Sequence, residues 1–532
     1  MSREQGTLPM LTATKLAARA LREALPADAD LGEVCLCLSF YDMKAVNELR
    51  RRLGGLPSSE RNYWIGTLYT LMISPEKRRS QAAYFTPPDL AEAVIDLAIE
   101  QGFDLKKDDV FDPAAGGAAF LSLIAERMRA AGAHVKDIAY RLNGMEIDPS
   151  LAEMSESLIA RELEGFRERR IVKVGDALHT DPLASYKLVI ANPPYGRITP
   201  KDLQGNAWER VSHSGHINKY AVFTELCLRV AKPNGLVALV IPSSFRSGPL
   251  YDRMRAYIAS QGQVLALGTV VNRDDVFADV AQDVSVLLVR KGESHRAVLP
   301  TKFPSFAGSG IRHPIHAASL GEDMSAPWLA PSGFEREIGG ATIADYGAAA
   351  KAGHFVWNRE KDKFCGPDDP NAIPLIWAKN IRAGRKCVPA NRKGTGVDFV
   401  QVPQGSTSIA KAPAVVAQRT TNSSQSRRII AAPVDEVSIA QGFVGENHTI
   451  VMTGQDAELL DLLALLLNTK AVDDRYRAVS GTATVSVKLL RELDLPAPEA
   501  FKAALKKLSN PEEAAILAYR AGADRRRLAE AS

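Results

Sequence analysis

Between about residues 80 and 295, short apolar runs alternate with longer segments in which apolar positions recur every three or four residues. The short runs predict β-strands and the longer segments predict amphipathic helices. We expect strands at 109–113, 140–147, 170–177, 187–193, 235–242, 264–271 and 284–290, with helices at 89–101, 118–132, 150–165 and 220–232. This alternation is typical of an α/β fold built on a doubly wound, mostly parallel sheet.

The rest of the chain has a different pattern. Residues 1–75 have mostly helical periodicity, and a passage rich in Pro, Gly and Ser predicts a linker at 301–335. Beyond it, short strands, turns and a long helix over 456–470 predict a mixed α+β domain at 336–500 and an exposed helical tail at 501–532. The expected organisation is thus a helical extension at 1–75, the α/β domain at 76–300, the linker, the second domain and the tail.

Composition narrows the class of protein. A chain of 532 residues is too long for one hydrophobic core, and 46% hydrophobic with 24% charged residues is ordinary for a soluble globular protein. No apolar run approaches the length needed to cross a bilayer, and the start has no signal-peptide core, so we expect a cytoplasmic protein without membrane attachment. Five cysteines indicate a reducing compartment, and Cys35 and Cys37 lie in an apolar run typical of a core rather than of a metal site.

The net charge of +4 hides an uneven distribution. Residues 377–430 contain ten Lys or Arg and a single acid, Asp398. A solvated surface normally mixes both signs, so this basic segment is a candidate contact for a polyanion, although such runs often serve only solubility.

Polar residues follow several predicted strands at the edge where ligands of such sheets bind. Asp112 begins the small-residue loop "DPAAGGAAFL", Glu146 and Asp148 end the second strand, Asp176 ends the third and Asn192 the fourth. The loop lacks the lysine of a phosphate-binding loop and the spacing of a dinucleotide fingerprint. Glu146 could bind both hydroxyls of a ribose and Asp176 an exocyclic amine, and S-adenosylmethionine fits such a site. Asp148 precedes "PSLAEM" and is more simply a helix N-cap.

With these motifs in order, the chain resembles the γ-type N6-adenine DNA methyltransferases of bacterial type II restriction–modification systems. The motifs are "YFTPPDLA", "DPAAGGAAFL", "NGMEIDP", "VGDAL", "NPPY", "NKYAVFTELCLRVAKPNGLVALVIPSSF" and "VFADVAQDVSVLLVRK". "VVAQRTTNSSQSRRIIAA", "GENHTIV" and "SGTATVSVKLLRELDLPAP" resemble the target-recognition half of these enzymes. The resemblance implies a Rossmann-like methyltransferase sheet as catalytic domain at 76–300 and a target-recognition domain at 336–500. The chain departs from the family's loop pattern D-P-x-x-G-x-G at one position, where Ala118 replaces the second glycine.

The segment "NPPY" suits methyl transfer to an adenine amine, whose lone pair is delocalised into the ring. Two acceptors aimed at its protons, the Asn192 side-chain oxygen and the Pro193 carbonyl, would restore the lone pair. Pro194 stiffens the segment and Tyr195 offers a face on which the base can stack. Without its neighbours, N-P-P-Y equally well describes a rigid turn.

The resemblance also implies further residues and partners. A target base must be flipped out of the duplex, and Phe277 would stack on it opposite Tyr195, although it could equally be a core residue. Thr86 would contact the methionine end of S-adenosylmethionine, Asp112 with Gly116 the loop side, and Ile147 the adenine. No metal is implied. We expect a monomer in the bacterial cytoplasm that acts on double-stranded DNA, beside a separate restriction endonuclease for the same site.

For DNA contacts in the basic segment we expect Arg419, Thr420, Arg427 and Arg428 to be the leading candidates. A methyltransferase that modifies a glutamine amide shares the NPPY chemistry but has no reason to carry a large basic second domain. A DNA-binding module without activity has no reason to keep Glu146, Asp176 and Asn192 at successive strand ends. An RNA substrate remains an alternative.

Overall fold

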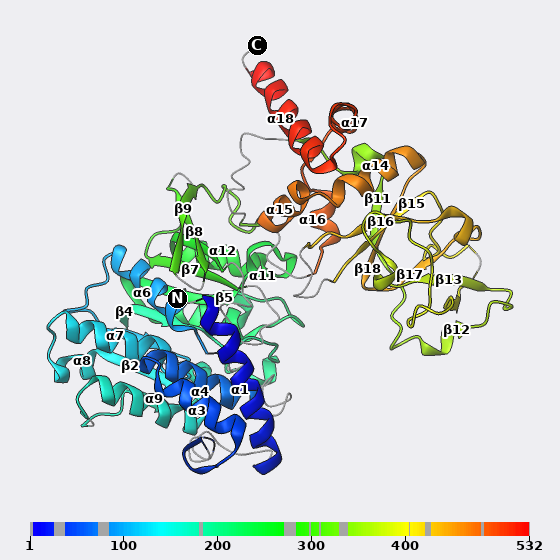
Figure 1. Ribbon diagram of the computed structural model, residues 1–532. Coiled ribbons are helices and arrows are strands. Elements are labelled where there is room, and N and C mark those ends of the chain that lie inside the picture. Colours follow the sequence, from blue (N-terminus) through cyan, green and yellow to red (C-terminus); the bar gives the residue numbers. More distant parts are fainter. Residues whose placement is uncertain are drawn as a thin grey trace. The chain divides into compact units, whose positions relative to one another are not determined.

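A nine-stranded sheet is the centre of the first of two units, Met1–Trp328 and Leu329–Ser532, into which the computed structural model divides (Figure 1). The structure describes residues 4–25, 34, 38–72, 85–166, 168–179, 185–270, 284–296, 299–307, 310–328, 339–403, 405–420, 427–479 and 484–530. No helix within these ranges is long and apolar enough to cross a membrane.

The sheet has the strand order β3-β2-β1-β4-β5-β7-β6-β8-β9. The first five strands in this order, from β3 through β2, β1 and β4 to β5, run parallel to one another. Strand β7 is antiparallel to both of its neighbours, β5 and β6. The bounds are β1 Val110–Asp112, β2 Leu142–Glu146, β3 Val172–Val174, β4 Tyr186–Ala191, β5 Ala231–Pro242, β6 Gly262–Val270 and β7 Val284–Lys291. Central strands of this kind are covered on both faces, which explains why their sequences are continuous apolar runs rather than alternating ones. The predicted doubly wound, mostly parallel sheet is confirmed.

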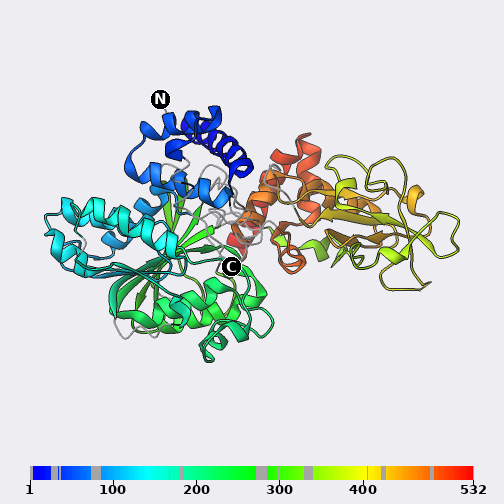
Figure 2. The same ribbon diagram turned by 90° about the horizontal axis from the view of Figure 1, so that it is seen from below.

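Helices cover both faces of this sheet, as Figure 2 shows. They are α6 Pro88–Glu100, α7 Ala119–Ala130, α8 Val135–Arg141, α9 Pro149–Glu162, α10 Lys219–Val230, the short α11 Ser244–Ser247 and α12 Asp252–Gln261. Helix α6 begins with a proline, whose fixed φ and missing N–H suit the first helical position.

Three helices in the region predicted to be helical, α1 Glu4–Ala24, α3 Lys44–Gly54 and α4 Ser58–Met72, share a hydrophobic core. Trp64, Leu68 and Tyr69 of α4 are among its buried residues, and so is Leu151 of α9. Phe85 packs against the same core from outside. These helices are therefore joined by apolar packing to the part of the α/β unit that follows strand β2.

The predicted linker at 301–335 is wrong over its first half. Residues Thr301–Ala307 and Gly310–Ala318 form strands β8 and β9, and β8 pairs in parallel with β6. Phe303 and Phe306 of β8 are buried, and the unit ends only at Trp328, a fully buried residue whose ring contacts Phe245. Apolar residues on short strands rich in Pro and Gly resemble a linker locally, and only pairing with β6 decides otherwise.

The second unit contains two small four-stranded sheets and a two-stranded pair. Their orders are β11-β18-β15-β16, β12-β14-β13-β17 and β10-β19. The strands are β10 Gly340–Ala341, β11 Ala349–Ala352, β12 Phe364–Cys365, β13 Ala372–Ile376, β14 Phe399–Gln401, β15 Ala414–Gln418, β16 Ala431–Pro433, β17 Val444–Gly445, β18 Thr449–Thr453 and β19 Leu495–Pro496. The helices are α14 Ala457–Leu467, α15 Lys470–Val479, α16 Val487–Arg491, α17 Pro498–Lys507 and α18 Pro511–Glu530.

The prediction of an exposed helical tail at 501–532 is also wrong, because part of this segment is buried. Helices α17 and α18 are present, but Phe501, Ala515 and Tyr519 are buried in the same core as α14 and the sheet of β15 and β18. Tyr519 also donates a hydrogen bond to the carbonyl of Asp494 at 2.9 Å. The tail is therefore part of the second unit, because its apolar face finds a partner that its own sequence does not reveal.

The limits of the first unit can be tested by truncation. A chain ending after Trp328 should unfold cooperatively, whereas a chain ending at residue 300 should melt at a markedly lower temperature. The shorter chain loses the buried Phe303 and Phe306 and leaves β6 as an open sheet edge. Circular dichroism of both truncations measures the difference, and equal melting temperatures would show that β8 and β9 do not contribute to this fold.

Candidate active site

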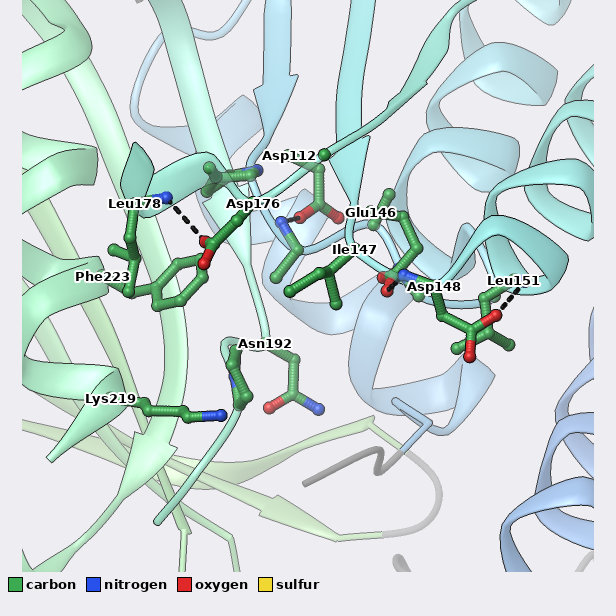
Figure 3. Close-up of a pocket in the computed structure, with 18 of the residues that line it drawn as sticks. Asp112, Glu146, Ile147, Asp148, Leu151, Asp176, Leu178, Asn192, Lys219 and Phe223 are labelled. Atoms are coloured by element: carbon green, nitrogen blue, oxygen red, sulfur yellow. Dashed lines mark hydrogen bonds between the residues drawn. The ribbon is translucent and has the colours of Figure 1, made fainter. Parts of the chain in front are cut away.

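A cavity of about 320 Å³ lies at the carboxyl ends of β1, β2, β3 and β4 (Figure 3). Its walls include the polar residues that follow these strands, namely Asp112, Glu146, Asp176 and Asn192. They meet because parallel strands bring their carboxyl ends to one edge of the sheet. Thr86, Gly116 and Ile147 line the same cavity, so the structure brings together all the residues predicted to bind the cofactor.

The loop after β1 is shaped by two residues with left-handed backbone. Gly116 has φ of 51° and Ala118 has φ of 53°. Only glycine adopts this region without a steric penalty, so Ala118 costs about 1 kcal/mol where the family pattern has glycine. Ala118 nevertheless adopts the left-handed conformation in this loop.

Glu146 ties the first two loops together. Its two carboxylate oxygens accept hydrogen bonds from the backbone N–H of Gly116 at 2.8 Å and from that of Asp148 at 2.9 Å. Burial raises the pKa of Glu146, although these backbone donors oppose the shift. A carboxylate oxygen accepts more than one hydrogen bond, so each oxygen keeps a lone pair for a ligand hydroxyl.

Asp112 and Asp148 have different surroundings. Asp112 is completely buried, and the loss of solvation raises its pKa to about 8, while a hydrogen bond from the N–H of Ala114 opposes the shift. Asp148 accepts from the N–H groups of Ser150 and Leu151 at 2.9 and 3.1 Å, which confirms its predicted role as the N-cap of α9. Asp176 accepts from the N–H of Leu178 at 2.9 Å and holds the turn after β3.

The NPPY segment continues β4 into the cavity. The Asn192 amide nitrogen donates to the hydroxyl of Thr86 at 3.1 Å, and its side-chain oxygen accepts from the hydroxyl of Tyr195 at 2.9 Å. The orientation of the amide is thereby fixed with nitrogen toward Thr86 and oxygen toward Tyr195. Asn192 and Pro194 line the cavity, and Pro193 is buried.

Tyr195 differs from expectation. Its side chain is only 6% exposed, and its hydroxyl also donates to the carbonyl of Val240 at 3.3 Å. The ring packs edge-on against Tyr220, with centroids 6.3 Å apart. The predicted open face for a base is therefore absent in this conformation, because the hydroxyl finds its acceptors inside the protein.

Several residues that line the cavity escaped the sequence-based prediction, among them Phe223, Lys219 and Phe85. Phe223 lies across the cavity from Ile147, and Lys219 extends beside Asn192 (Figure 3). Both come from one face of α10, since residues four apart are neighbours on a helix. The signal was the segment "NKYAVF", in which their spacing is visible but their direction is not. The third is Phe85, the residue before Thr86.

The predicted DNA contacts lie in the second unit in two different settings. Arg427, which is partly exposed, forms an ion pair with Glu512 at 2.8 Å and donates to the carbonyl of Asn468, so its guanidinium already has partners within the second unit. The guanidinium of Arg419 donates to the carbonyl of Asn447 at 3.1 Å. Thr420 is exposed.

Two predicted site residues remain, Arg428 and Phe277. The backbone N–H of Arg428 donates to the carboxylate of Asp473 at 2.6 Å, and its side chain is half-buried. Phe277, the predicted second aromatic, lies outside the described residues. Among the residues that the structure describes, no group of three or more His, Cys, Asp or Glu side chains could hold a metal ion.

The sheet order and the row of carboxylates and amide at its strand ends define a Rossmann-like methyltransferase fold. Residues 64–302 match the model of the family described as N-6 DNA Methylase. This part of the chain is similar to that family.

Two of the named proteins similar to this chain are type II methyltransferases. The type II methyltransferase M.PstI of Providencia stuartii is 24% identical over 338 residues, which are 59% of this chain and 66% of the relative. The type II methyltransferase M.TthHB8I of Thermus thermophilus is 26% identical over 239 residues, which are 42% of this chain and 48% of the relative. The matched part is less than two thirds of the length of either relative.

Solved structures resemble the fold at lower similarity. The type IIL restriction-modification enzyme MmeI in complex with DNA has a TM-score of 0.49 at 12% identity, covering 91% of this chain and 80% of that chain. The type IIG restriction endonuclease BpuSI has a TM-score of 0.45 at 12% identity, covering 96% of this chain and 72% of that chain.

Proposed function

We propose that this protein transfers a methyl group from S-adenosylmethionine to the N6 amine of adenine in a specific sequence of double-stranded DNA. It would be a site-specific adenine DNA methyltransferase that flips its target base. The observation that carries the proposal is the Asn192 amide in one cavity with the carboxylates Asp112, Glu146 and Asp176. We further infer that it acts as a monomer in the bacterial cytoplasm and protects DNA from a separate restriction endonuclease.

The cavity fits S-adenosylmethionine in size and chemistry. Ile147 and Phe223 offer apolar walls for an adenine, and Glu146 and Asp176 offer acceptors for ribose hydroxyls and for the adenine amine. Thr86, Asp112 and Gly116 form the remaining side, where the methionine portion would lie. The carboxyl oxygens of the lining suit a ligand rich in hydrogen-bond donors, and the cofactor supplies an electrophilic methyl group when bound.

The reacting amine would be activated by acceptors rather than by a strong base. The side-chain oxygen of Asn192 and the carbonyl of Pro193 would each accept a hydrogen bond from one N–H of the N6 amine and return the nitrogen lone pair. In the structure that Asn192 oxygen already accepts from Tyr195. An entering base would therefore replace the tyrosine hydroxyl, and the ring would have to turn outward before the base could stack on it.

The cofactor assignment is tested by two neighbouring acids. Replacing Glu146 by alanine should weaken S-adenosylmethionine binding about tenfold or more, because it removes the ribose acceptor and the tie between two loops. Asp148→Ala is the matched control and should mainly lower the free energy of unfolding, by about 1 kcal/mol, through loss of the helix cap. Isothermal titration calorimetry and urea unfolding separate the two effects. Equal losses of affinity in both variants would contradict the assignment.

The chemical step is tested at Asn192. Asn192→Ala should lower kcat by at least about a hundredfold with little change in cofactor affinity, as expected for the loss of one preorganised polar group at the reacting atom. Tyr195→Phe keeps the ring and the Asn192 acceptor, so its kcat should stay within about tenfold of the wild type. Transfer of tritiated methyl groups to unmethylated genomic DNA measures both. Methyl transfer to RNA at a similar rate would contradict the proposal that DNA is the substrate. An Asn192→Ala variant with more than about a tenth of wild-type kcat would refute the two-acceptor mechanism.

The DNA would be held by the second unit through its exposed cations. Lys379, Arg382, Arg385, Lys386, Arg392, Lys393 and Lys411 are all exposed. The guanidinium of Arg392 lies 4.1 Å from the centroid of the Trp357 ring, which holds this cation in a fixed position. We infer that these residues, rather than Arg427, supply the phosphate contacts.

A pair of double and single variants tests this choice. Neutralising Arg385 and Lys386 together should weaken DNA binding at every sequence and make its dependence on salt shallower by about two phosphate contacts. Arg427→Ala should leave the salt dependence unchanged, because that side chain is paired with Glu512. Fluorescence anisotropy over a range of salt concentrations distinguishes them. If Arg427→Ala alone made the salt dependence of DNA binding shallower, Arg427 would be a phosphate contact after all.

A further inference from the structure

Two walls of the cofactor cavity belong to the core of the N-terminal helices. Leu151 and Phe85 line the cavity, and both also pack with the core that α1, α3 and α4 share. The helices of residues 4–72 therefore reach the candidate active site through apolar contacts. The sequence offered no role for this part of the chain.

Phe85 is held in a slot between two glycines that come from different parts of the unit. A Cβ atom at Gly66 of α4 would lie 2.5 Å from the Phe85 ring, and one at Gly117 of the loop after β1 would lie 2.3 Å from it. Both distances are far inside van der Waals contact, so any other residue at either position would displace the ring. Gly66 lies inside a helix, where glycine is otherwise unfavourable. The close approach of the ring explains its presence there.

Phe85 lines two cavities. One is the large cavity, and the other is a small cavity of about 20 Å³ that Ser59, Asn62 and Tyr63 of α4 also line. Because Gly66 and Gly117 bracket the ring, displacement from this slot would move it into one of these two spaces. Either movement changes the wall of the large cavity.

The position of Phe85 also bears on the catalytic amide. Phe85 directly precedes Thr86, whose hydroxyl accepts from the Asn192 amide nitrogen at 3.1 Å. Thr86 is itself buried, so it has little freedom to adjust on its own. A continuous path of contacts thus runs from α4 through Phe85 and Thr86 to Asn192.

We infer that Phe85 is a positioning residue through which the N-terminal helices shape the cofactor cavity and orient Asn192. This inference rests on the proposed methyltransferase function. The helices hold the ring, the ring holds Thr86 at the cavity wall, and Thr86 fixes the rotation of the amide. The N-terminal helices are accordingly part of the active-site architecture of the full chain.

The test uses the full chain and Gly66→Ala, with Gly54→Ala as matched control. Gly54 ends α3, is exposed and has no atom within 4 Å of an added Cβ. Gly66→Ala should raise the Kd for S-adenosylmethionine about tenfold and lower kcat on unmethylated genomic DNA by at least about tenfold, since small misplacements at reacting groups have effects of this size. Gly54→Ala should leave both constants at wild-type values.

A compensating substitution separates positioning from simple destabilisation. Leucine lacks the Cε1 and Cζ atoms that the added Cβ would meet at 2.5 and 2.7 Å, and a change of rotamer can move its Cδ1 methyl. Combining Gly66→Ala with Phe85→Leu should therefore restore most of the affinity and of kcat. A double variant no better than Gly66→Ala would overturn the inference. So would a folded Gly66→Ala variant with wild-type Kd and kcat, whatever its melting temperature.

Two further measurements keep the result interpretable. If circular dichroism shows that Gly66→Ala does not fold, Phe85→Ala removes the ring without adding an atom to α4. Its Kd and kcat should change in the same direction, and unchanged constants would refute the inference. Failure of the wild-type chain to bind S-adenosylmethionine would instead refute the proposed function, because that measurement does not involve Phe85.

Discussion

The Glu146 carboxylate is the interaction on which the site depends. It is buried, where an ionised group is unfavourable unless hydrogen-bonded, and its two oxygens accept N–H groups from the loop after β1 and the turn after β2. This connection exists only because β1 and β2 are parallel neighbours, so their carboxyl ends meet. Glu146 thereby joins two of the loops that line the cavity.

A second set of contacts keeps the catalytic amide in order. Thr86 accepts from the amide nitrogen of Asn192 and Tyr195 donates to its oxygen. A polar group beside a cavity is costly when it has no partner, and Tyr195 meets this requirement in the structure without a base. The same acceptor is then available to an entering amine at the price of one tyrosine hydrogen bond. The Asn192 oxygen therefore has a hydrogen-bond donor both before and after a substrate amine binds.

The cations of the second unit serve two different purposes. Arg427 pairs with Glu512 on α18, whereas the cations between Lys379 and Lys393 are exposed on a short 3-10 helix and on the loops after it. Ion pairs between half-exposed groups contribute little to the free energy of unfolding, so the main effect of the Arg427–Glu512 pair is to orient α18. A count of charges along the chain does not distinguish these roles, because pairing depends on residues more than eighty positions apart.

Local pattern determined seven of the nine strands of the first unit's sheet and much of its site. Seven apolar runs matched strands β1 to β7, and the acids and the amide that follow the strands met in one cavity, because parallel topology requires their ends to meet. The N-cap role of Asp148 was also local, since it involves residues only two and three positions away.

Contacts between distant segments decided the rest. Strand β8 needed β6 as a partner, α18 needed the core beside α14, and the hydroxyl of Tyr195 needed the carbonyl of Val240. Phe85 is the clearest case, because its ring is bracketed by glycines 19 positions before it and 32 positions after it. A sequence shows the periodicity of an element and the chemistry of its residues. Which distant surface each residue faces is set by packing, and only the tertiary structure contains that information.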